Sequence, residues 1–198
     1  MADTAPWLLV GLGNPGSGYA KNRHNVGFMV VDEWCDDAYP RPSWRERWSA
    51  QVTSLTDPER GGRVVAVKPQ TYMNRSGESV QSAAHFHQVP RERILVVHDE
   101  LDFDFGRLAL KVGGGHGGHN GLRDLISRLG TRDFLRLRFG IGRPRHGDVS
   151  KWVLSDFADD DAAQLPDLLD AARKAVTTVF TKGVKQAMNI VNTTAAPA

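Results

Sequence analysis

The stretch GGGHGGHNGL, residues 113–122, joins a predicted strand to a predicted helix. The run RLALKV before it, residues 107–112, is typical of a strand, and the apolar residues from Leu122 to Leu129 recur at helical spacing. Six glycines in ten residues let another molecule approach the backbone, and N–H groups beside a helix N-terminus favour anions. The stretch therefore predicts a strand, a binding loop and a helix. Two simpler interpretations stay open: a flexible turn with incidental histidines, and Asn120 acting only as a helix N-cap.

Predicted strands and helices alternate along the rest of the chain. Strands are expected at residues 7–10, 48–55, 63–67, 94–97 and 134–141, and helices at 26–34, 76–89 and 165–180. Pro166 is expected in the first turn of the last helix, which Gly183 can end. Residues 56–62 join two consecutive strands, so the sheet is not all parallel. The pattern predicts an α/β fold with a twisted mixed sheet, mostly parallel, flanked by helices on both faces.

Length and composition fit a single domain spanning residues 1–198. The chain has enough residues for one packed core and shows no repeat or linker, and residues 193–198 are expected to form a frayed tail. The single cysteine, Cys35, excludes an internal disulfide and a cysteine-cluster zinc site. The sequence shows neither a leader-like N-terminus nor an apolar run of membrane-spanning length, so we expect a cytoplasmic protein.

Charge is distributed unevenly although the net charge is only +2. Residues 105–155 hold ten lysines and arginines against three aspartates, a local net charge of +7. Residues 156–170 hold six aspartates and no base. A basic stretch beside the glycine loop indicates a phosphate-rich partner. The alternative is a solvated surface whose charges cancel against the acidic run.

Four predicted loops carry polar side chains: residues 14–24, 72–74, 98–99 and 116–120. Asp99 follows a continuous apolar run, at the end of a central strand, where α/β folds place their sites. It is the acid best placed to partner a histidine, and His24 at a helix entrance is the preferred partner. A carboxylate that holds an imidazole fixes its tautomer and stabilises its cation, which suits a general base. The alternatives are a capping or surface histidine for His24 and a helix or turn cap after the strand for Asp99.

Two other kinds of site are weaker candidates. The sequence GLGNPG at residues 11–16 matches the glycine pattern of a dinucleotide site, but Pro15 lacks the N–H that a pyrophosphate would need. An Asn-Pro-Gly type II turn explains the motif more simply. His116 and His119 could bind a metal, but no third ligand is evident.

The loops carry a set of motifs in a definite order. They are GLGNPG at 11–16, Tyr19, RHN at 23–25, YMN at 72–74, HDELD at 98–102, the glycine stretch, RLRFGIG at 136–142 and KWVL at 151–154. With these motifs the chain resembles bacterial-type peptidyl-tRNA hydrolases from about Leu8 to Asn192. Each motif alone is weak, whereas the full ordered set is highly specific.

The resemblance implies a monomeric α/β hydrolase that cleaves the ester between a peptide and the 3′-terminal ribose of tRNA. It implies no metal and no cofactor, and from the residues themselves we expect no dinucleotide and no membrane partner. By position, His24 is expected to activate water, Asp99 to stabilise the protonated histidine, and Asn14 to separate N-blocked from free aminoacyl esters. Lys111 and Arg138 match the pair that grips the tRNA 5′-phosphate. The other matched residues, expected to contact the tRNA end or the peptide, are Tyr19, Tyr72, Met73, Asn74, His119 and Asn120.

Two competing functions use the same residues. A non-catalytic RNA-binding module would explain the basic stretch, and a dinucleotide oxidoreductase would explain the glycine motif at residues 11–16. A pure binder has no need of both His24 and Asp99, so the presence of the pair favours an enzyme.

Overall fold

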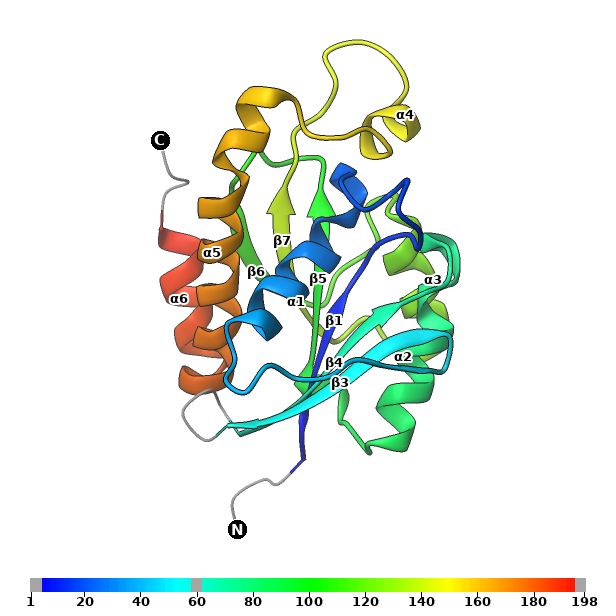
Figure 1. Ribbon diagram of the computed structural model, residues 1–198, viewed down its shortest axis with the longest axis vertical. Coiled ribbons are helices and arrows are strands. Elements are labelled where there is room, and N and C mark those ends of the chain that lie inside the picture. Colours follow the sequence, from blue (N-terminus) through cyan, green and yellow to red (C-terminus); the bar gives the residue numbers. More distant parts are fainter. Residues whose placement is uncertain (1–4, 58–61, 195–198) are drawn as a thin grey trace.

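The computed structural model describes residues 5–57 and 62–194, which fold around one seven-stranded sheet (Figure 1). The strand order is β2-β3-β4-β1-β5-β7-β6. In chain order the strands are β1 Trp7–Gly11, β2 Arg45–Arg47, β3 Ala50–Asp57, β4 Gly62–Pro69, β5 Ile94–Glu100, β6 Leu108–Val112 and β7 Leu135–Gly140. The prediction of a mixed sheet is confirmed, with the parallel strands β4, β1, β5 and β7 at its centre.

Parallel pairings make up half of the sheet rather than most of it. Three pairings are parallel, and the three that involve β2, β3 and β6 are antiparallel. Short connections account for the β2–β3 and β3–β4 pairs, because a tight turn can only reverse the chain, whereas a parallel neighbour needs a long crossover. Strands β6 and β7 are antiparallel although α3 lies between them in the chain. The predicted pairing of consecutive strands is confirmed by β3 and β4. Part of their predicted connection, residues 58–61, lies outside the described residues.

Helices cover both faces of the sheet (Figure 1). One face carries α1 Val26–Asp36, α5 Asp159–Lys182 and α6 Val184–Thr193, and the other carries α2 Ser76–Phe86 and α3 Asn120–Leu129. A short helix, α4 Val149–Val153, lies beyond the ends of the central strands. The described residues also form 3₁₀ turns at Arg23–Asn25, Met73–Arg75 and Arg91–Arg93. Within the described ranges, no helix has the length and apolar content to cross a membrane.

Strand β5 is buried on both faces, as its apolar run predicts. Leu95 and Val97 belong to the core beneath α1 and α5, whereas Ile94 and Val96 belong to the core beneath α2 and α3. Successive side chains of a strand point to opposite faces, so one strand contributes to both cores. The polar end of β5 is thereby fixed at the centre of the sheet edge.

Strand β1 and helix α1 approach each other closely through glycine. A Cβ at Gly11 would lie 2.4 Å from the Gly27 carbonyl oxygen, and a Cβ at Gly27 would lie 2.5 Å from the Leu12 nitrogen. Larger side chains at these positions would push α1 away from the sheet. The first glycine of the motif at residues 11–16 therefore serves helix packing, which brings the entrance of α1 next to the end of β5.

The C-terminal helices differ from the prediction in two respects. Helix α5 begins at Asp159, so Pro166 lies inside the helix and not in its first turn. Three aspartates occupy that first turn, where the helix dipole stabilises negative charge and extends the helix toward its N-terminus. Gly183 ends α5 as predicted, but α6 follows directly and was not predicted. Thr193 is the last residue of α6, and the predicted tail beyond Thr194 lies outside the described residues.

Candidate active site

A buried carboxylate at the end of β5 lies between two histidines. Oδ1 of Asp99 is 2.8 Å from Nδ1 of His24 and 2.8 Å from Nε2 of His119. His24 lies in the 3₁₀ turn before α1, and His119 is the residue before α3. The structure therefore brings together the predicted His24–Asp99 pair. The bond from His119 to the same oxygen was not predicted.

Hydrogen bonds define which nitrogen of each ring carries a proton. Nδ1 of His119 accepts the N–H groups of Gly121 and Leu122 at 3.1 and 3.3 Å, so the proton of this ring is on Nε2 and is donated to Asp99. His119, and not Asn120, is thus the N-cap of α3. Since an ionised carboxylate only accepts hydrogen bonds, Nδ1 of His24 donates to Asp99 as well. That leaves the lone pair of neutral His24 on Nε2.

The surroundings shift the pKa values of this pair in opposite directions. Burial lowers the pKa of His24, but the charge of Asp99 and the hydrogen bond to it outweigh burial, and the pKa of His24 is raised above its ordinary value. Burial raises the pKa of Asp99, but the charges of His24 and His119 and their hydrogen bonds outweigh it and lower that pKa. Asp99 therefore stays ionised, and His24 is a stronger base than a free imidazole.

A chain of amides surrounds the turn after β1. Oδ1 of Asn25 accepts the N–H of Asn14, and Nδ2 of Asn25 donates to the carbonyl of Asn14, each at 2.9 Å. Oδ1 of Asn14 in turn accepts the N–H of Met73 at 2.8 Å. The oxygen of the Asn14 side chain is thus engaged within the protein, and its NH₂ group is the part left to meet a ligand. Gly16 at φ 100 fits the type II turn predicted here.

The glycine loop is held by a buried arginine. Nη1 and Nη2 of Arg136 donate to the carbonyls of Gly115 and Gly114, each at 2.6 Å. Gly114, Gly117 and two other loop glycines have φ between 55° and 99°, a region that residues with a Cβ rarely adopt. Arg136 is only 3% exposed, so it is one base of the +7 stretch that is not available to an external phosphate. Arg136 thus ties two carbonyl groups of the loop to strand β7.

Lys111 and Arg138 lie on neighbouring strands at the rim of one cavity. The cavity has a volume of about 370 Å³, and its lining also includes His24, Asp99, His119 and Asn120. Nε of Arg138 donates to Oε2 of Glu100 at 2.9 Å, whereas Lys111 is exposed and has no acidic partner among the described residues. The two predicted phosphate ligands are thus close together, but only Lys111 carries an uncompensated charge.

Four predicted contact residues, Tyr19, Tyr72, Met73 and Asn74, lie outside the lining of the cavity that contains His24. Tyr19 and Tyr72 meet edge to face, with ring centroids 6.4 Å apart, and Tyr72 is 61% exposed. Asn74 is exposed beside them, and the buried Met73 packs against Gly121 of α3. These residues are outside the lining of the cavity and connect to it through Asn25, the residue after His24.

Three supporting residues were missed by sequence reasoning, namely Asn25, Arg23 and His98. Arg23 lies 3.7 Å from the ring centroid of Trp152, and its Nη1 donates to Oγ of Ser155 at 2.8 Å, so it fixes the 3₁₀ turn of His24 to the segment after α4. His98 donates from Nδ1 to the carbonyl of Asp99 at 2.7 Å, and its Nε2 is buried without a partner. The RHN and HDELD motifs contain all three, but only the fold shows what they contact.

Two alternative sites can be compared with this geometry. The donor atoms of His24, Asp99 and His119 lie within 4.8 Å of one another and could be considered as metal ligands. Both histidines, however, donate an N–H group to Asp99, so these hydrogen bonds explain why the three side chains lie close together. At the dinucleotide-like motif, Leu12 donates its N–H to Val97 at 3.0 Å, and Asn14 donates to Asn25, so these groups are not free for a pyrophosphate.

Comparison with known proteins gives one consistent family. The family model described as peptidyl-tRNA hydrolase matches residues 8–198. Relatives with that name include one from Sorangium cellulosum, 47% identical over 96% of this chain and 85% of its own length, and one from Geobacter sulfurreducens, 46% identical over 93% and 94%. The crystal structure of peptidyl-tRNA hydrolase from Acinetobacter baumannii superposes with a TM-score of 0.89 at 39% identity, covering 98% of each chain.

Proposed function

The chain belongs to the peptidyl-tRNA hydrolase family and is a hydrolase of that type, and from this premise we propose how its site works. We propose that His24 is the general base for water that attacks the ester between a peptide and the 3′-terminal ribose of tRNA. Asp99 orients His24 and stabilises its protonated form. The reaction releases free tRNA and a peptide. The tRNA of stalled or aborted translation thereby becomes available for reuse.

One observation carries the proposal: Oδ1 of Asp99 accepts from both His24 and His119. Because Asp99 binds Nδ1 of His24, the basic nitrogen is Nε2, and His24 lines the cavity beside the glycine loop. A water bonded to Nε2 can lose a proton as its oxygen attacks the ester carbonyl. The proton then goes to the leaving ribose oxygen, so His24 ends the cycle neutral.

Substrate placement follows the distribution of charge and aromatic surface. We propose that Lys111 and Arg138 bind the 5′-phosphate of tRNA at the rim of the cavity. The tRNA end and the peptide are then expected to contact Tyr19, Tyr72, Met73, Asn74, His119 and Asn120. For His119 this contact would come from its ring carbons, since both of its nitrogens already have protein partners.

Asn14 is proposed to select N-blocked substrates. Its Oδ1 accepts from Met73, so its NH₂ group is the part of the side chain left to donate to a substrate. A peptidyl or N-acetyl group offers a carbonyl oxygen that can accept this N–H. A free aminoacyl ester offers an ammonium, which is itself only a donor and would lose solvation without gaining a partner.

The assay is release of free tRNA from N-acetyl-aminoacyl-tRNA by purified protein, with a chelator present. We expect hydrolysis by the wild type, loss of it in His24→Ala, and no effect of the chelator. Turnover that disappears with chelator and returns with a divalent metal would overturn the metal-free mechanism. Binding of tRNA without hydrolysis by the wild type would instead support the non-catalytic RNA-binding alternative. We further expect a monomer, which sedimentation of the same preparation measures.

A further inference from the structure

A strained turn carries a half-buried tryptophan, which packs on the core and lies outside the lining of the cavity of His24. Trp48 and Ser49 join β2 to β3 with φ of 54° and 52°. Glycine or asparagine normally occupies such a two-residue turn, because a Cβ disfavours left-handed backbone. The carbonyl of Ser49 accepts the Gln70 N–H at 2.7 Å and the Ser79 hydroxyl at 3.1 Å, which holds the turn in place. The chain thus keeps a large aromatic ring where backbone geometry favours a residue without one.

The ring of Trp48 belongs to an exposed cluster with a central arginine. The guanidinium carbon of Arg47 lies 4.2 Å from the Trp48 ring centroid and 3.9 Å from that of Phe86, and these two rings are 5.1 Å apart. Phe86 is 53% exposed. Within the described part of the chain, the Arg47 side chain has neither a hydrogen bond nor an ion pair. Packing therefore fixes its position and leaves its N–H donors available, which suits a phosphate ligand.

A cavity of about 340 Å³ opens beside this cluster. Arg45, Arg47, Trp48 and His87 line it together with three hydroxyl-bearing side chains, and none of the described residues in the lining is acidic. Burial and then the charges of Arg63 and Arg47 lower the pKa of His87, so its ring is neutral at pH 7. The lining combines cations, aromatic rings and hydroxyl groups, which is the chemistry that binds a nucleotide.

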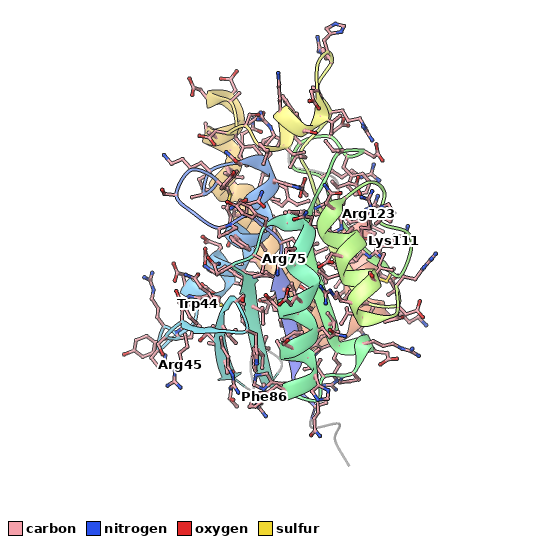
Figure 2. All side chains as sticks on the ribbon, turned by 90° about the vertical axis from the view of Figure 1, so that its right-hand side faces the viewer. Trp44, Arg45, Arg75, Phe86, Lys111 and Arg123 are labelled. Carbon is pink, nitrogen blue, oxygen red and sulfur yellow. The ribbon has the colours of Figure 1, made fainter. Side chains whose placement is uncertain are left out.

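The cavity and Lys111 of the active-site cavity lie toward opposite edges of the sheet. Figure 2 shows Arg45 at one side of the view and Lys111 at the other, and their strands, β2 and β6, are the two edge strands. An RNA strand offers phosphates together with planar bases, which fits the combination of arginines and aromatic rings in this lining.

We propose that this cavity binds one nucleotide unit of RNA, with its phosphodiester on Arg45 and Arg47 and its base against the aromatic part of the lining, formed by Trp48 and His87. The site is separate from the one that cleaves the ester. The choice of RNA as the polyanion rests on the proposed function, but the binding itself does not require catalysis.

The test measures binding of a fluorescently labelled, single-stranded octaribonucleotide by anisotropy across a salt series. Arg47→Gln should weaken binding at least about 5-fold and reduce the salt dependence by about 0.7 in log–log slope, the value for one phosphate contact on a single strand. Phe86→Leu keeps apolar contact with Arg47 but removes the aromatic face that positions its guanidinium, so it should weaken binding, though less than Arg47→Gln does. Arg45→Gln, an exposed change without packing consequences, gives a further variant that does not disturb folding. Arg91→Gln, an exposed arginine paired with Glu92, is the matched control and should bind like the wild type.

A second measurement distinguishes the source of the RNA. KM is compared for N-acetyl-aminoacyl-tRNA and for the same ester on a CCA trinucleotide. If the nucleotide belongs to the substrate, the Arg47 variant raises KM only for the full tRNA; if it belongs to another RNA, KM stays unchanged for both. The inference is overturned if the Arg47 and Phe86 variants bind the octaribonucleotide as tightly as the wild type does. It is also overturned if Arg91→Gln weakens binding as much as they do. Failure of the wild type to cleave either ester would overturn the proposed function instead.

Discussion

Asn25 holds the backbone of Asn14 with two hydrogen bonds, accepting its N–H and donating to its carbonyl at 2.9 Å each. Asn25 directly follows His24 and is nearly fully buried. The residue proposed to recognise the N-blocked substrate is therefore fixed to the turn that carries the proposed base. A shift of one would displace the other.

Selection of N-blocked esters should depend on the donor group of Asn14. Asn14→Asp keeps the oxygen that accepts from Met73 but replaces the NH₂ group by a second acceptor, which attracts an ammonium and repels a carbonyl oxygen. We expect kcat/KM to fall for N-acetyl-aminoacyl-tRNA and to rise or hold for aminoacyl-tRNA. Rate measurements on both esters decide this. Equal losses on the two substrates would show that Asn14 shapes the site without selecting.

Removal of the base should abolish most turnover without unfolding the protein. We expect His24→Ala to lose about 10²- to 10⁴-fold in kcat, the usual contribution of general-base catalysis, with little change in Tm. Asp99→Asn should lose less, because the imidazole remains but is poorly oriented. Single-turnover rates and thermal melts of both variants provide the measurement. Near-normal turnover in His24→Ala would remove this residue from the mechanism.

The pH dependence of kcat/KM should report the raised pKa of His24. The base acts when neutral, so the rate should rise with pH and reach half its maximum above about 6.5, the ordinary pKa of histidine. Asp99→Asn removes the charge that raises this pKa, so its half-maximal point should move to lower pH. A profile from pH 5 to 9 for each protein tests the shift. Identical midpoints would mean that another group controls the rate.

Lys111 should affect substrate binding more than chemistry. Lys111→Gln removes a phosphate contact remote from the ester, so KM should rise more than kcat falls, and the salt slope of tRNA binding should drop by about 0.9. Lys151→Gln removes an equal charge from an exposed residue of the same basic stretch and serves as control. An unchanged slope in Lys111→Gln, or an equal change in both variants, would place the phosphate elsewhere.

His98 should make the protein sensitive to acid. Complete burial is the main cause that lowers the pKa of His98 to about 3, whereas in the unfolded chain it is about 6.5. Between these values the unfolded state binds the extra proton, so stability falls as pH decreases, by about 1.4 kcal/mol per unit from this group. His98→Gln cannot take up that proton, and its free energy of unfolding should fall less between pH 6.5 and 5. Denaturant titrations at several pH values measure the difference, and parallel curves for both proteins would contradict it.

The sequence predicted elements with strong periodicity better than it predicted their ends. The buried strand β5 and the helix after the glycine loop follow from apolar spacing that only one packing arrangement satisfies. The start of α5 was predicted six residues too late because its first turns are polar and are stabilised by the dipole, not by apolar contacts. Helix α6 is short and follows α5 after one residue, so no loop composition separates the two.

For the site, sequence predicted which residues converge but not how each is used. His24 and Asp99 come from loops that a parallel sheet brings to one edge, which makes their meeting predictable. The use of Arg136 inside the glycine loop and the bond from His119 to Asp99 depend on side-chain directions set by the whole fold. The local charge of +7 included Arg136 among the bases available to a partner, because a count of bases in the sequence carries no information on burial.

The ring of His119 caps the N-terminus of α3 and at the same time donates a hydrogen bond to the carboxylate of Asp99. Serine, aspartate or asparagine can cap a helix, but none of them also carries an N–H on the opposite side of a rigid ring, as this role requires. Evolution therefore cannot adjust the start of α3 and the environment of Asp99 independently at this position. A designer who transplants the site to another scaffold must move the helix entrance together with the acid, since the two share one side chain.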